Sequence, residues 1–165
     1  IALAMEVNQT VLVVDADLRN PEVGWQFGMD VEKGLLDYLH SDVEVEDLLV
    51  NPGFDRLVVL PGRHTTDISS EFLSLPKMSS LVEELKSRYQ SRIILFDLPP
   101  LLSTDDALLF MPHFDAALLV VEDGKTTPDE VNQSLALLEE TNLAGMVLNK
   151  SKGKVGKSYQ SRKYG

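Results

Sequence analysis

Acidic or amide side chains stand at the ends of three apolar runs in this sequence. Asp15 and Asp97 each end such a run (VLVVD and IILFD), Asp17 follows the first, and Asn149 follows a third, GMVL. A buried apolar strand has no structural use for a terminal carboxylate, because removing the charge from water costs free energy unless a metal ion, a donor or water satisfies it. Two such acids on neighbouring strands could hold Mg²⁺ through water. One of them could also orient an attacking hydroxyl and take its proton.

The same acids have a purely structural interpretation. An acid after a strand is often a helix N-cap or a turn residue, and the Leu-Pro-Pro that follows Asp97 indicates a turn. For one strand-end acid the structural role is the more frequent one. Asp15, Asp17 and Asp97 together favour a functional site, in which a nucleoside triphosphate would supply the remaining oxygen ligands of the metal.

The elements that would position these residues alternate along the chain. Continuous apolar runs predict five strands, each buried on both faces as in a parallel sheet. They cover residues 11–15, 57–60, 93–97, 117–121 and 145–148, and helical patterns cover residues 34–40, 45–49, 78–89, 105–110 and 128–141. This alternation predicts a doubly wound α/β fold with a mainly parallel sheet flanked by helices. Ligands of such folds bind beyond the carboxyl ends of the strands, where the acids stand.

Composition and charge exclude several classes of protein. The chain has 165 residues, 44% of them hydrophobic, which suffices for one domain with a core. The lack of cysteine excludes disulfides and thiolate metal sites. The net charge of -11 disfavours nonspecific nucleic-acid binding. Every acidic residue precedes Lys150, so we predict a domain at 1–149 and a basic, flexible, tyrosine-containing C-terminal tail at 150–165.

Two segments carry a more specific signal. VLVVDADLRNP (11–21) resembles the modified second nucleotide motif of bacterial tyrosine autokinases, the BY-kinases of capsular and exopolysaccharide biosynthesis. IILFDLPPLLSTDDALLF (93–110) resembles their acidic strand motif and the loop after it. The resemblance continues in the family's order through GLLDYLHSDVEVEDLL, LPGRHTTDISSEFL, ALLVVEDGKTTPDEV and GMVLNKS. It implies the P-loop NTPase fold of the MinD/ParA-like ATPases, with ATP and Mg²⁺ as cofactors.

The resemblance also implies roles for single residues. Asp15 and Asp17 match the catalytic acids that activate the tyrosine hydroxyl, and Asp15 also assists the metal. Asp97 matches the acid that positions magnesium through water, and Asn149 matches a position near the nucleotide base. Arg19 lies in the same motif and is assigned with Asn149 to cofactor binding. A local ion pair is the alternative for Arg19, and a turn residue is the alternative for Asn149.

The family's tyrosine-rich tail is phosphorylated in trans by a neighbour in a ring, so the resemblance makes Tyr159 and Tyr164 the candidate phosphoacceptors. It implies an ATP-dependent protein tyrosine autokinase that regulates exopolysaccharide chain length and export. The implied partners are further copies of the chain and a membrane chain-length-determinant (Wzz-like) protein. The implied location is the cytoplasmic face of the cell membrane. A MinD/ParA-type positioning ATPase and a non-catalytic interaction module are the alternatives.

The phosphate-binding loop of the family, G-x-x-x-x-G-K-[ST], does not occur in the sequence. GKTT at 124–127 lacks the first glycine and is predicted to be a surface turn before a helix opened by Pro128; GKVGKS at 153–158 lacks it too. Residues 1–7 are typical of the end of the helix that such a loop caps, so we expect the loop roughly ten residues before Ile1. An N-terminally truncated chain of this kind should bind ATP weakly and should not turn over. Trp25 and Phe27 are predicted to pack in the interior.

Overall fold

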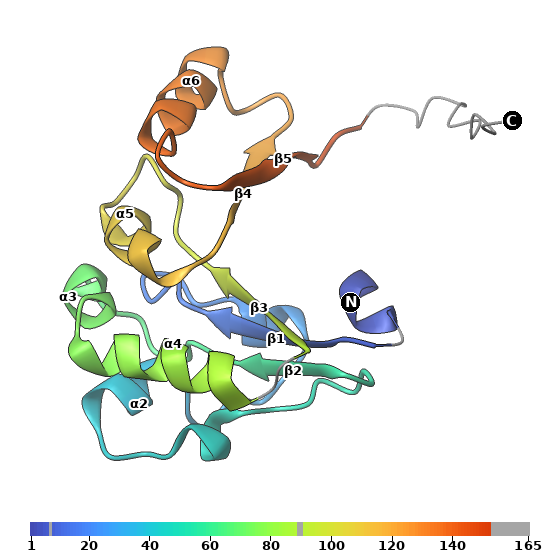
Figure 1. Cartoon of the computed structure of the whole chain (residues 1–165), viewed down its shortest axis with the longest axis vertical. Coiled ribbons are helices and arrows are strands. Elements are labelled where there is room, and N and C mark those ends of the chain that lie inside the picture. The colour runs from blue at the N-terminus through green and yellow to red at the C-terminus, as the bar shows by residue number, and fades with distance from the viewer. Residues whose placement is uncertain (7, 89–90, 153–165) are drawn as a thin grey trace, which may run out of the picture. The chain divides into compact units, whose positions relative to one another are not determined.

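The chain divides into two compact units, Ile1–Phe114 and Asp115–Gly165. Our computed structural model describes residues 1–6, 8–88 and 91–152. Figure 1 labels the helices and strands of both units. The predicted tail of residues 150–165 stays a prediction, because residues 153–165 lie outside the described part of the chain.

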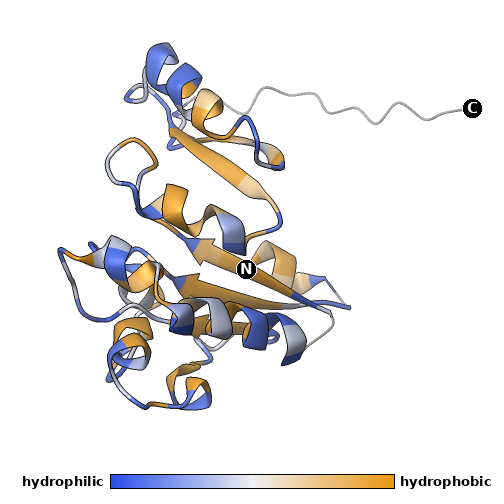
Figure 2. Ribbon diagram, turned by 60° about the vertical axis from the view of Figure 1, so that its left-hand side comes forward, coloured by the Kyte–Doolittle hydropathy of each residue, from blue (hydrophilic) through white to orange (hydrophobic). Residues whose placement is uncertain are grey.

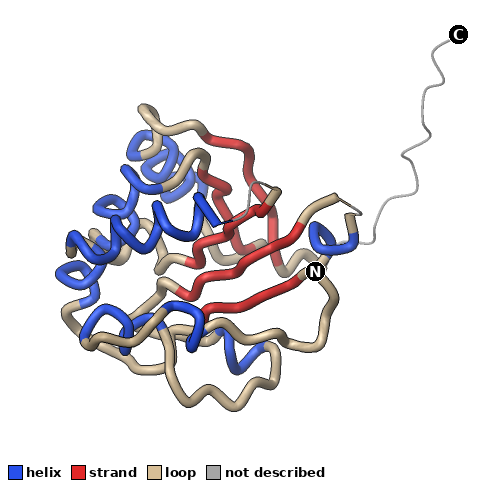
Figure 3. Tube along the Cα trace, turned by 60° about the horizontal axis from the view of Figure 1, so that its bottom comes forward, coloured by secondary structure: helices blue, strands red, loops and turns tan. Residues whose placement is uncertain are grey.

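The first unit contains a three-stranded parallel sheet in the order β2-β1-β3 (Figures 1 and 3). Its strands are β1 (Thr10–Asp15), β2 (Leu57–Leu60) and β3 (Arg92–Asp97). Strand β1 lies in the centre, and its register pairs Val14 with Leu60 and Asp15 with Asp97. The predicted parallel α/β architecture is therefore confirmed, and the two strands that end in aspartate are neighbours.

Helices precede, connect and follow these strands. They are η1 (Ala2–Met5), α1 (Val23–Gln26), α2 (Leu35–His40), η2 (Val45–Leu48), α3 (Ser69–Leu73), α4 (Pro76–Arg88), α5 (Asp106–Phe110) and η3 (Met111–His113). Helix α4 begins at a proline, whose missing N–H has no partner in a first turn in any case. Residues 2–5 form a 3₁₀ turn in place of the predicted end of an α-helix, because Ala4 N–H donates to the Ile1 carbonyl, three residues back.

The core of the first unit joins β1 to α4. Leu12 and Val14 of β1 are fully buried, as are Leu81 and Leu85 of α4 and Phe110 of α5. The strands are apolar along almost their whole length in Figure 2. Burying these side chains is the main stabilising contribution to the fold, at roughly 1.5–3 kcal/mol each. This core fixes the carboxyl ends of β1 and β3, where the acids stand.

The second unit contains a parallel pair, β4 (Ala117–Glu122) and β5 (Leu143–Asn149), and helix α6 (Pro128–Leu137). Residues 124–127 form the turn before α6, as predicted. Thr127 accepts from Glu130 N–H at 3.3 Å, and the Glu130 carboxylate accepts from Thr127 N–H at 2.8 Å, which makes a capping box. Helix α6 ends at Leu137, not at residue 141, because two acids follow, which are unfavourable at the negative end of the helix dipole.

The prediction that every strand is buried on both faces is wrong for β4 and β5, and in part for β3, where Leu95 is 43% exposed. Leu118, Val120 and Met146 are 59%, 57% and 54% exposed. Covering both faces of a sheet takes helices on both sides, and the described residues of this unit contain one α-helix. No helix among the described residues is long and apolar enough to cross a membrane.

Candidate functional site

Asp15 and Asp97 lie opposite each other at the carboxyl end of the first sheet. They are register partners on the adjacent parallel strands β1 and β3, and Ala16 N–H donates to the Asp97 carbonyl at 2.9 Å. Asp15 is 1% exposed, whereas Asp97 is exposed. The structure therefore brings together the two acids that we predicted to hold a metal ion.

The two carboxylate oxygens of Asp15 differ in their contacts. Oδ2 accepts from the backbone N–H of Val23, the first residue of α1, at 2.9 Å. Oδ1 is buried and has no hydrogen-bond partner among the described residues. Burial raises the pKa of Asp15 to about 6. The backbone N–H groups of Val23 and Gly62 oppose this rise, and the charge of Asp97 adds to it. Asp15 is thus a mostly ionised carboxylate at neutral pH, and one of its oxygens is buried without a hydrogen-bond partner among the described residues.

The segment after β2 is pressed against Asp15. A Cβ added at Gly62 would lie 2.4 Å from Pro21 Cβ and 3.2 Å from Asp15 Cγ. A Cβ added at Gly34 would lie 2.5 Å from the Pro61 carbonyl oxygen. Only glycine permits these approaches, so both positions hold the segment at residues 61–63 tightly beside the acid.

Asp17 has a structural role as well as its charge. Its Oδ1 accepts from the backbone N–H of Arg19 at 3.2 Å and of Asn20 at 3.0 Å, which closes a turn after β1. Its charge also raises the pKa of Asp97, second to the desolvation of that carboxyl. Asp17 therefore closes the turn after β1, and its negative charge also acts on the carboxyl of Asp97.

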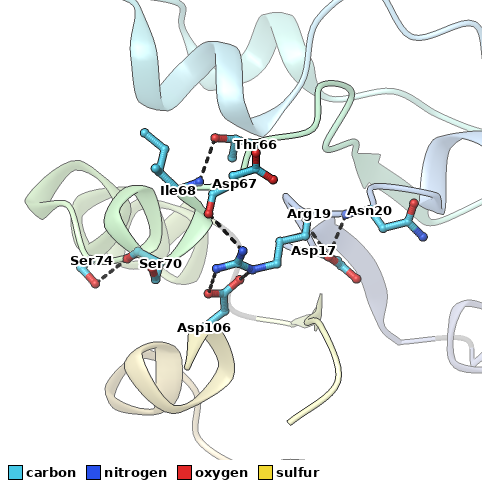
Figure 4. A network of polar contacts seen from close by, with 9 residues as sticks. All are labelled: Asp17, Arg19, Asn20, Thr66, Asp67, Ile68, Ser70, Ser74 and Asp106. Atoms are coloured by element: carbon cyan, nitrogen blue, oxygen red, sulfur yellow. Dashed lines mark hydrogen bonds and ion pairs between the residues drawn. The ribbon is translucent and has the colours of Figure 1, made fainter. Parts of the chain in front are cut away.

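Arg19 makes an ion pair, and its partner is distant in the sequence (Figure 4). Its Nε donates to Asp106 Oδ2 at 2.8 Å and its Nη2 to Asp106 Oδ1 at 3.0 Å, in the two-pronged geometry that suits a guanidinium. Its Nη1 donates to the Asp67 carbonyl at 3.0 Å. The alternative interpretation, in which Arg19 forms an ion pair, is thus confirmed. Its partner, however, is distant in the sequence and not local. Asp106 is fully buried and was missed, because nothing in its local pattern distinguishes it from a helix-start acid.

The other predicted residues lie elsewhere. Asn149 ends β5 in the second unit, opposite Glu122, and its Oδ1 accepts from Lys150 N–H at 2.9 Å. That local contact fits its turn interpretation. Tyr159 and Tyr164 lie outside the described residues.

A hollow of about 180 Å³ adjoins Asp15. Trp25 lines it and is 75% exposed, so the prediction that Trp25 packs in the interior is wrong. Helix α1 has a single turn, which buries Val23 and Gly24 and leaves the next side chain outside. Phe27 packs edge-on against Phe54, with ring centroids 6.3 Å apart, as expected of a packing residue. The full lining is Asp15, Pro21, Gly24, Trp25, Met29, Val31, Pro61 and Arg63.

The donor set suits a hard divalent cation. Asp15 offers a buried oxygen that no described residue contacts by a hydrogen bond, and Asp97 offers a second carboxylate from the next strand. In the part of the chain that the structure describes, no three or more His, Asp or Glu side chains gather as a metal-binding group. Mg²⁺ fits two carboxylates, because it usually keeps several waters and takes few protein ligands.

No family model matches the chain. Among curated proteins it is similar to the tyrosine-protein kinase etk of Escherichia coli K12, with 30% identity over 150 residues, 90% of this chain and 20% of that protein. It is also similar to the tyrosine-protein kinase YwqD of Bacillus subtilis 168, with 29% identity over 144 residues, 86% of this chain and 60% of that protein. The chain thus spans less than two-thirds of the length of these relatives.

Solved structures of a related kinase domain and of a MinD protein are also similar to this chain. The kinase domain of VpsO matches with a TM-score of 0.81 and 27% identity over 91% of this chain and 73% of that domain. The septum site-determining protein MinD of Pyrococcus horikoshii, complexed with Mg-ADP, matches with a TM-score of 0.71 and 25% identity over 92% of this chain and 63% of that protein. The chain is therefore a relative of the bacterial tyrosine-protein kinases, and it has the P-loop NTPase fold that their kinase domains share with MinD.

Proposed function

We propose that this chain is the kinase domain of an ATP-dependent protein tyrosine autokinase that regulates exopolysaccharide chain length and export. The observation that carries the proposal is Oδ1 of Asp15, which is buried beside Asp97 at the carboxyl end of the parallel sheet and has no hydrogen-bond partner in the described part of the chain. The similarity to named tyrosine-protein kinases supports the reaction class.

Asp15 acts as the base in this proposal. The hydroxyl oxygen of a tyrosine forms a bond to the γ-phosphorus of ATP, and the bond from that phosphorus to the bridging oxygen breaks, so ADP leaves. The hydroxyl proton passes to Asp15. A pKa of about 6 leaves this carboxylate mostly ionised at pH 7, and makes it a stronger base than an exposed aspartate.

Asp97 and Asp15 would hold Mg²⁺, which when bound supplies neutralisation of the phosphate charge. Asp17 keeps the turn after β1 in place and adds negative charge beside Asp97. Arg19 would contact the nucleotide through the N–H groups that Asp106 and Asp67 leave free. Asn149 would lie near the base, and Tyr159 and Tyr164 would accept phosphate.

The proposal includes partners and a location. Copies of the chain associate as a ring or a dimer, so that one presents its tyrosines to another. A membrane chain-length-determinant (Wzz-like) protein holds the kinase at the cytoplasmic face of the cell membrane. The 165-residue chain alone, whose sequence has no phosphate-binding loop, binds ATP weakly and does not turn over.

The test uses the protein expressed from its complete coding sequence. It is incubated with ATP and Mg²⁺, and phosphotyrosine is mapped by mass spectrometry beside an Asp97→Ala variant. We expect phosphate on Tyr159 or Tyr164 in the parent and none in the variant. Phosphotyrosine that persists in Asp97→Ala would remove Asp97 from the site, and absence of phosphotyrosine from the parent would reject the autokinase.

A positioning ATPase is the second candidate, favoured by the structural similarity to MinD. The same incubation separates the two functions. Hydrolysis of ATP without phosphotyrosine on the chain supports the positioning ATPase, and neither activity leaves a non-catalytic interaction module.

A further inference from the structure

The motif that carries the acids of the site also carries a positive charge. Arg19 is the one lysine or arginine in residues 11–21, and it stands two positions after Asp17. A guanidinium stays charged in proteins and pairs with a carboxylate through two parallel hydrogen bonds. Such a pair at either of the strand-end acids, Asp15 and Asp97, would occupy oxygens that Mg²⁺ needs. The position of the Arg19 guanidinium therefore matters to the proposed metal site.

Asp106 holds this guanidinium at the start of α5. Nε and Nη2 of Arg19 donate to the two oxygens of Asp106 at 2.8 and 3.0 Å, and Nη1 donates to the Asp67 carbonyl at 3.0 Å. In Figure 4 the guanidinium points toward Asp106 and Asp67, whereas the carboxylate of Asp17 lies beside Asn20. Among the described residues, no hydrogen bond joins the guanidinium to a strand-end acid.

The two members of the pair differ in burial. The side chain of Asp106 is fully buried, whereas that of Arg19 is 32% exposed. A buried carboxylate has to keep its partner, because an unpaired buried charge is strongly unfavourable, whereas a surface guanidinium can change partners at little cost. The hydrogen bond to Asp106 raises the pKa of Arg19, and the charge of Asp17 adds to that rise. Asp17 therefore attracts the same guanidinium, and the buried carboxylate of Asp106 outcompetes it.

The backbone of the turn after β1 has further supports. Ala16 N–H donates to the Asp97 carbonyl at 2.9 Å, and Thr66 N–H donates to the Leu18 carbonyl at 2.8 Å. Oδ1 of Asp17 accepts from two backbone N–H groups within the turn. Loss of the buried carboxylate would therefore release the guanidinium while these contacts still hold the turn.

We propose that Asp106 is a positioning residue of the metal site, which holds the Arg19 guanidinium at α5 and so keeps that positive charge off the strand-end acids. This rests on the proposed binding of Mg²⁺ by Asp15 and Asp97, and adds to it a residue that acts only through Arg19. A neutral side chain at position 106 releases a cation beside acidic groups, where it competes with Mg²⁺ for the same oxygens.

Metal binding without nucleotide tests the role of Asp106. The 165-residue chain is titrated with Mn²⁺, which prefers the same oxygen ligands as Mg²⁺, and free Mn²⁺ is measured by electron paramagnetic resonance. The difference between each protein and its Asp97→Ala counterpart gives the binding at the strand-end acids. We expect Asp106→Asn to weaken this binding about tenfold, because an opposite charge close to a carboxylate changes its affinity for a cation by about that factor.

Two further variants separate positioning from a loss of structure and from a loss of charge. Arg19→Gln, added to Asp106→Asn, should restore Mn²⁺ binding to within about twofold of the parent, because no cation is then released. Asp105→Asn is the matched control, since it removes an exposed acid directly before α5, and it should change the binding by about twofold at most. Asp106→Ser takes the place of Asp106→Asn if the latter loses its fold by circular dichroism.

Two results would overturn the positioning role alone. One is Mn²⁺ binding that is unchanged in the neutral variants of Asp106, and the other is a loss that persists when Arg19→Gln is added. Equal binding by the parent and Asp97→Ala would overturn the positioning role together with the proposed metal site.

Steady-state kinetics of the complete protein separate this inference from the proposed function. We expect Asp106→Asn to raise the Mg²⁺ concentration for half-maximal phosphate transfer about tenfold, with little change in kcat at saturating Mg²⁺, because excess metal displaces the guanidinium. A purely structural defect would lower kcat at every Mg²⁺ concentration. Phosphate transfer with an unchanged Mg²⁺ requirement would overturn the positioning role and leave the kinase. Mn²⁺ binding that is weakened by Asp106→Asn and restored by Arg19→Gln, in a protein that transfers no phosphate, would leave the positioning role and remove the kinase.

Discussion

The proposed reaction needs Asp15 in its ionised form, and the same ionised form lowers the stability of the folded chain. Its carboxyl is 1% exposed, and burial raises its pKa to about 6 from an ordinary value of 3.8. Between these two values the folded chain binds a proton that the unfolded chain has released. Stability therefore falls as the pH rises from about 4 through about 6, by roughly 2–3 kcal/mol in all.

Asp15→Asn should remove this pH dependence, because an amide does not ionise and its oxygen can still accept from Val23 N–H. We expect the difference in the free energy of unfolding, variant minus parent, to increase by roughly 2–3 kcal/mol between pH 4 and pH 7. Urea denaturation at both values checks it, with the exposed Asp30→Asn as the control. A difference that does not change with pH would mean that the pKa of Asp15 is not raised.

The Arg19–Asp106 pair shows how a motif residue depends on a distant partner. The carboxylate of Asp106 is fully buried and takes two donors from the guanidinium. The pair joins the turn after β1 to the start of α5 and, through the Asp67 carbonyl, to the segment before α3. The ion pair thus fixes the turn that also carries Asp17.

Arg19→Ala should destabilise the chain more than the double variant Arg19→Ala/Asp106→Asn does. The single variant leaves a buried charge without its partner, whereas the double variant removes the charge as well. Thermal unfolding of the four members of the cycle checks the order, and the exposed pair of Lys125 and Glu122 is the control, for which we expect little coupling. Additive effects at Arg19 and Asp106 would show that the two side chains do not act as a pair.

At the scale of elements, the turns that follow β1 and β2 matter more to the site than the helices do. Gly34, immediately before α2, lies against the backbone of Pro61 and Gly62, and Gly62 lies against Pro21 and Asp15. These contacts join three segments that are far apart in the sequence. They explain how a short strand of four residues, β2, can hold a rigid segment beside the acid.

Gly34→Ala should destabilise the chain by about 3 kcal/mol, because the new Cβ would lie 2.5–2.7 Å from backbone atoms of Pro61 and Gly62 that cannot easily move. Gly24→Ala is the matched control. Its Cβ would meet one methyl group of Val31 at 2.8 Å, so we expect about 1 kcal/mol or less. Urea denaturation measures both, and equal costs would show that the backbone contact at Gly34 can relax.

At the scale of the whole molecule, the two units differ in how well their strands are covered. Strand β1 pairs on both sides, and Val11, Leu12 and Val14 are at most 1% exposed. Strand β5 pairs with β4 alone among the described strands, and Met146 and Leu148 are more than half exposed.

Amide hydrogen exchange should follow this difference. Exchange is slowest where opening requires the loss of most buried contacts, so we expect the amides of β1 to be protected at least about tenfold more than those of β5. Mass spectrometry of peptic peptides, corrected for intrinsic exchange rates, measures the two segments in one sample. Equal protection would indicate that the two units open together.

The order of the elements and the acids at their ends can be predicted from local sequence patterns. The apolar runs before Asp15 and Asp97 are local, and the alternation of strands and helices leaves few parallel arrangements. For that reason the parallel sheet and the turn before α6 could both be predicted. The motif segments also identified the kinase relatives, because a motif is itself a local pattern.

The contacts that each of those residues makes depend on how the whole chain packs. Asp106 lies 87 positions from Arg19, and Gly62 lies beside Gly34 and Asp15 through contacts that no local pattern records. The exposure of Trp25 and the unpartnered oxygen of Asp15 depend on packing between several elements at once. Local sequence specifies which side chains leave a strand end, whereas burial, pairing and the free space beside them are properties of the packed chain.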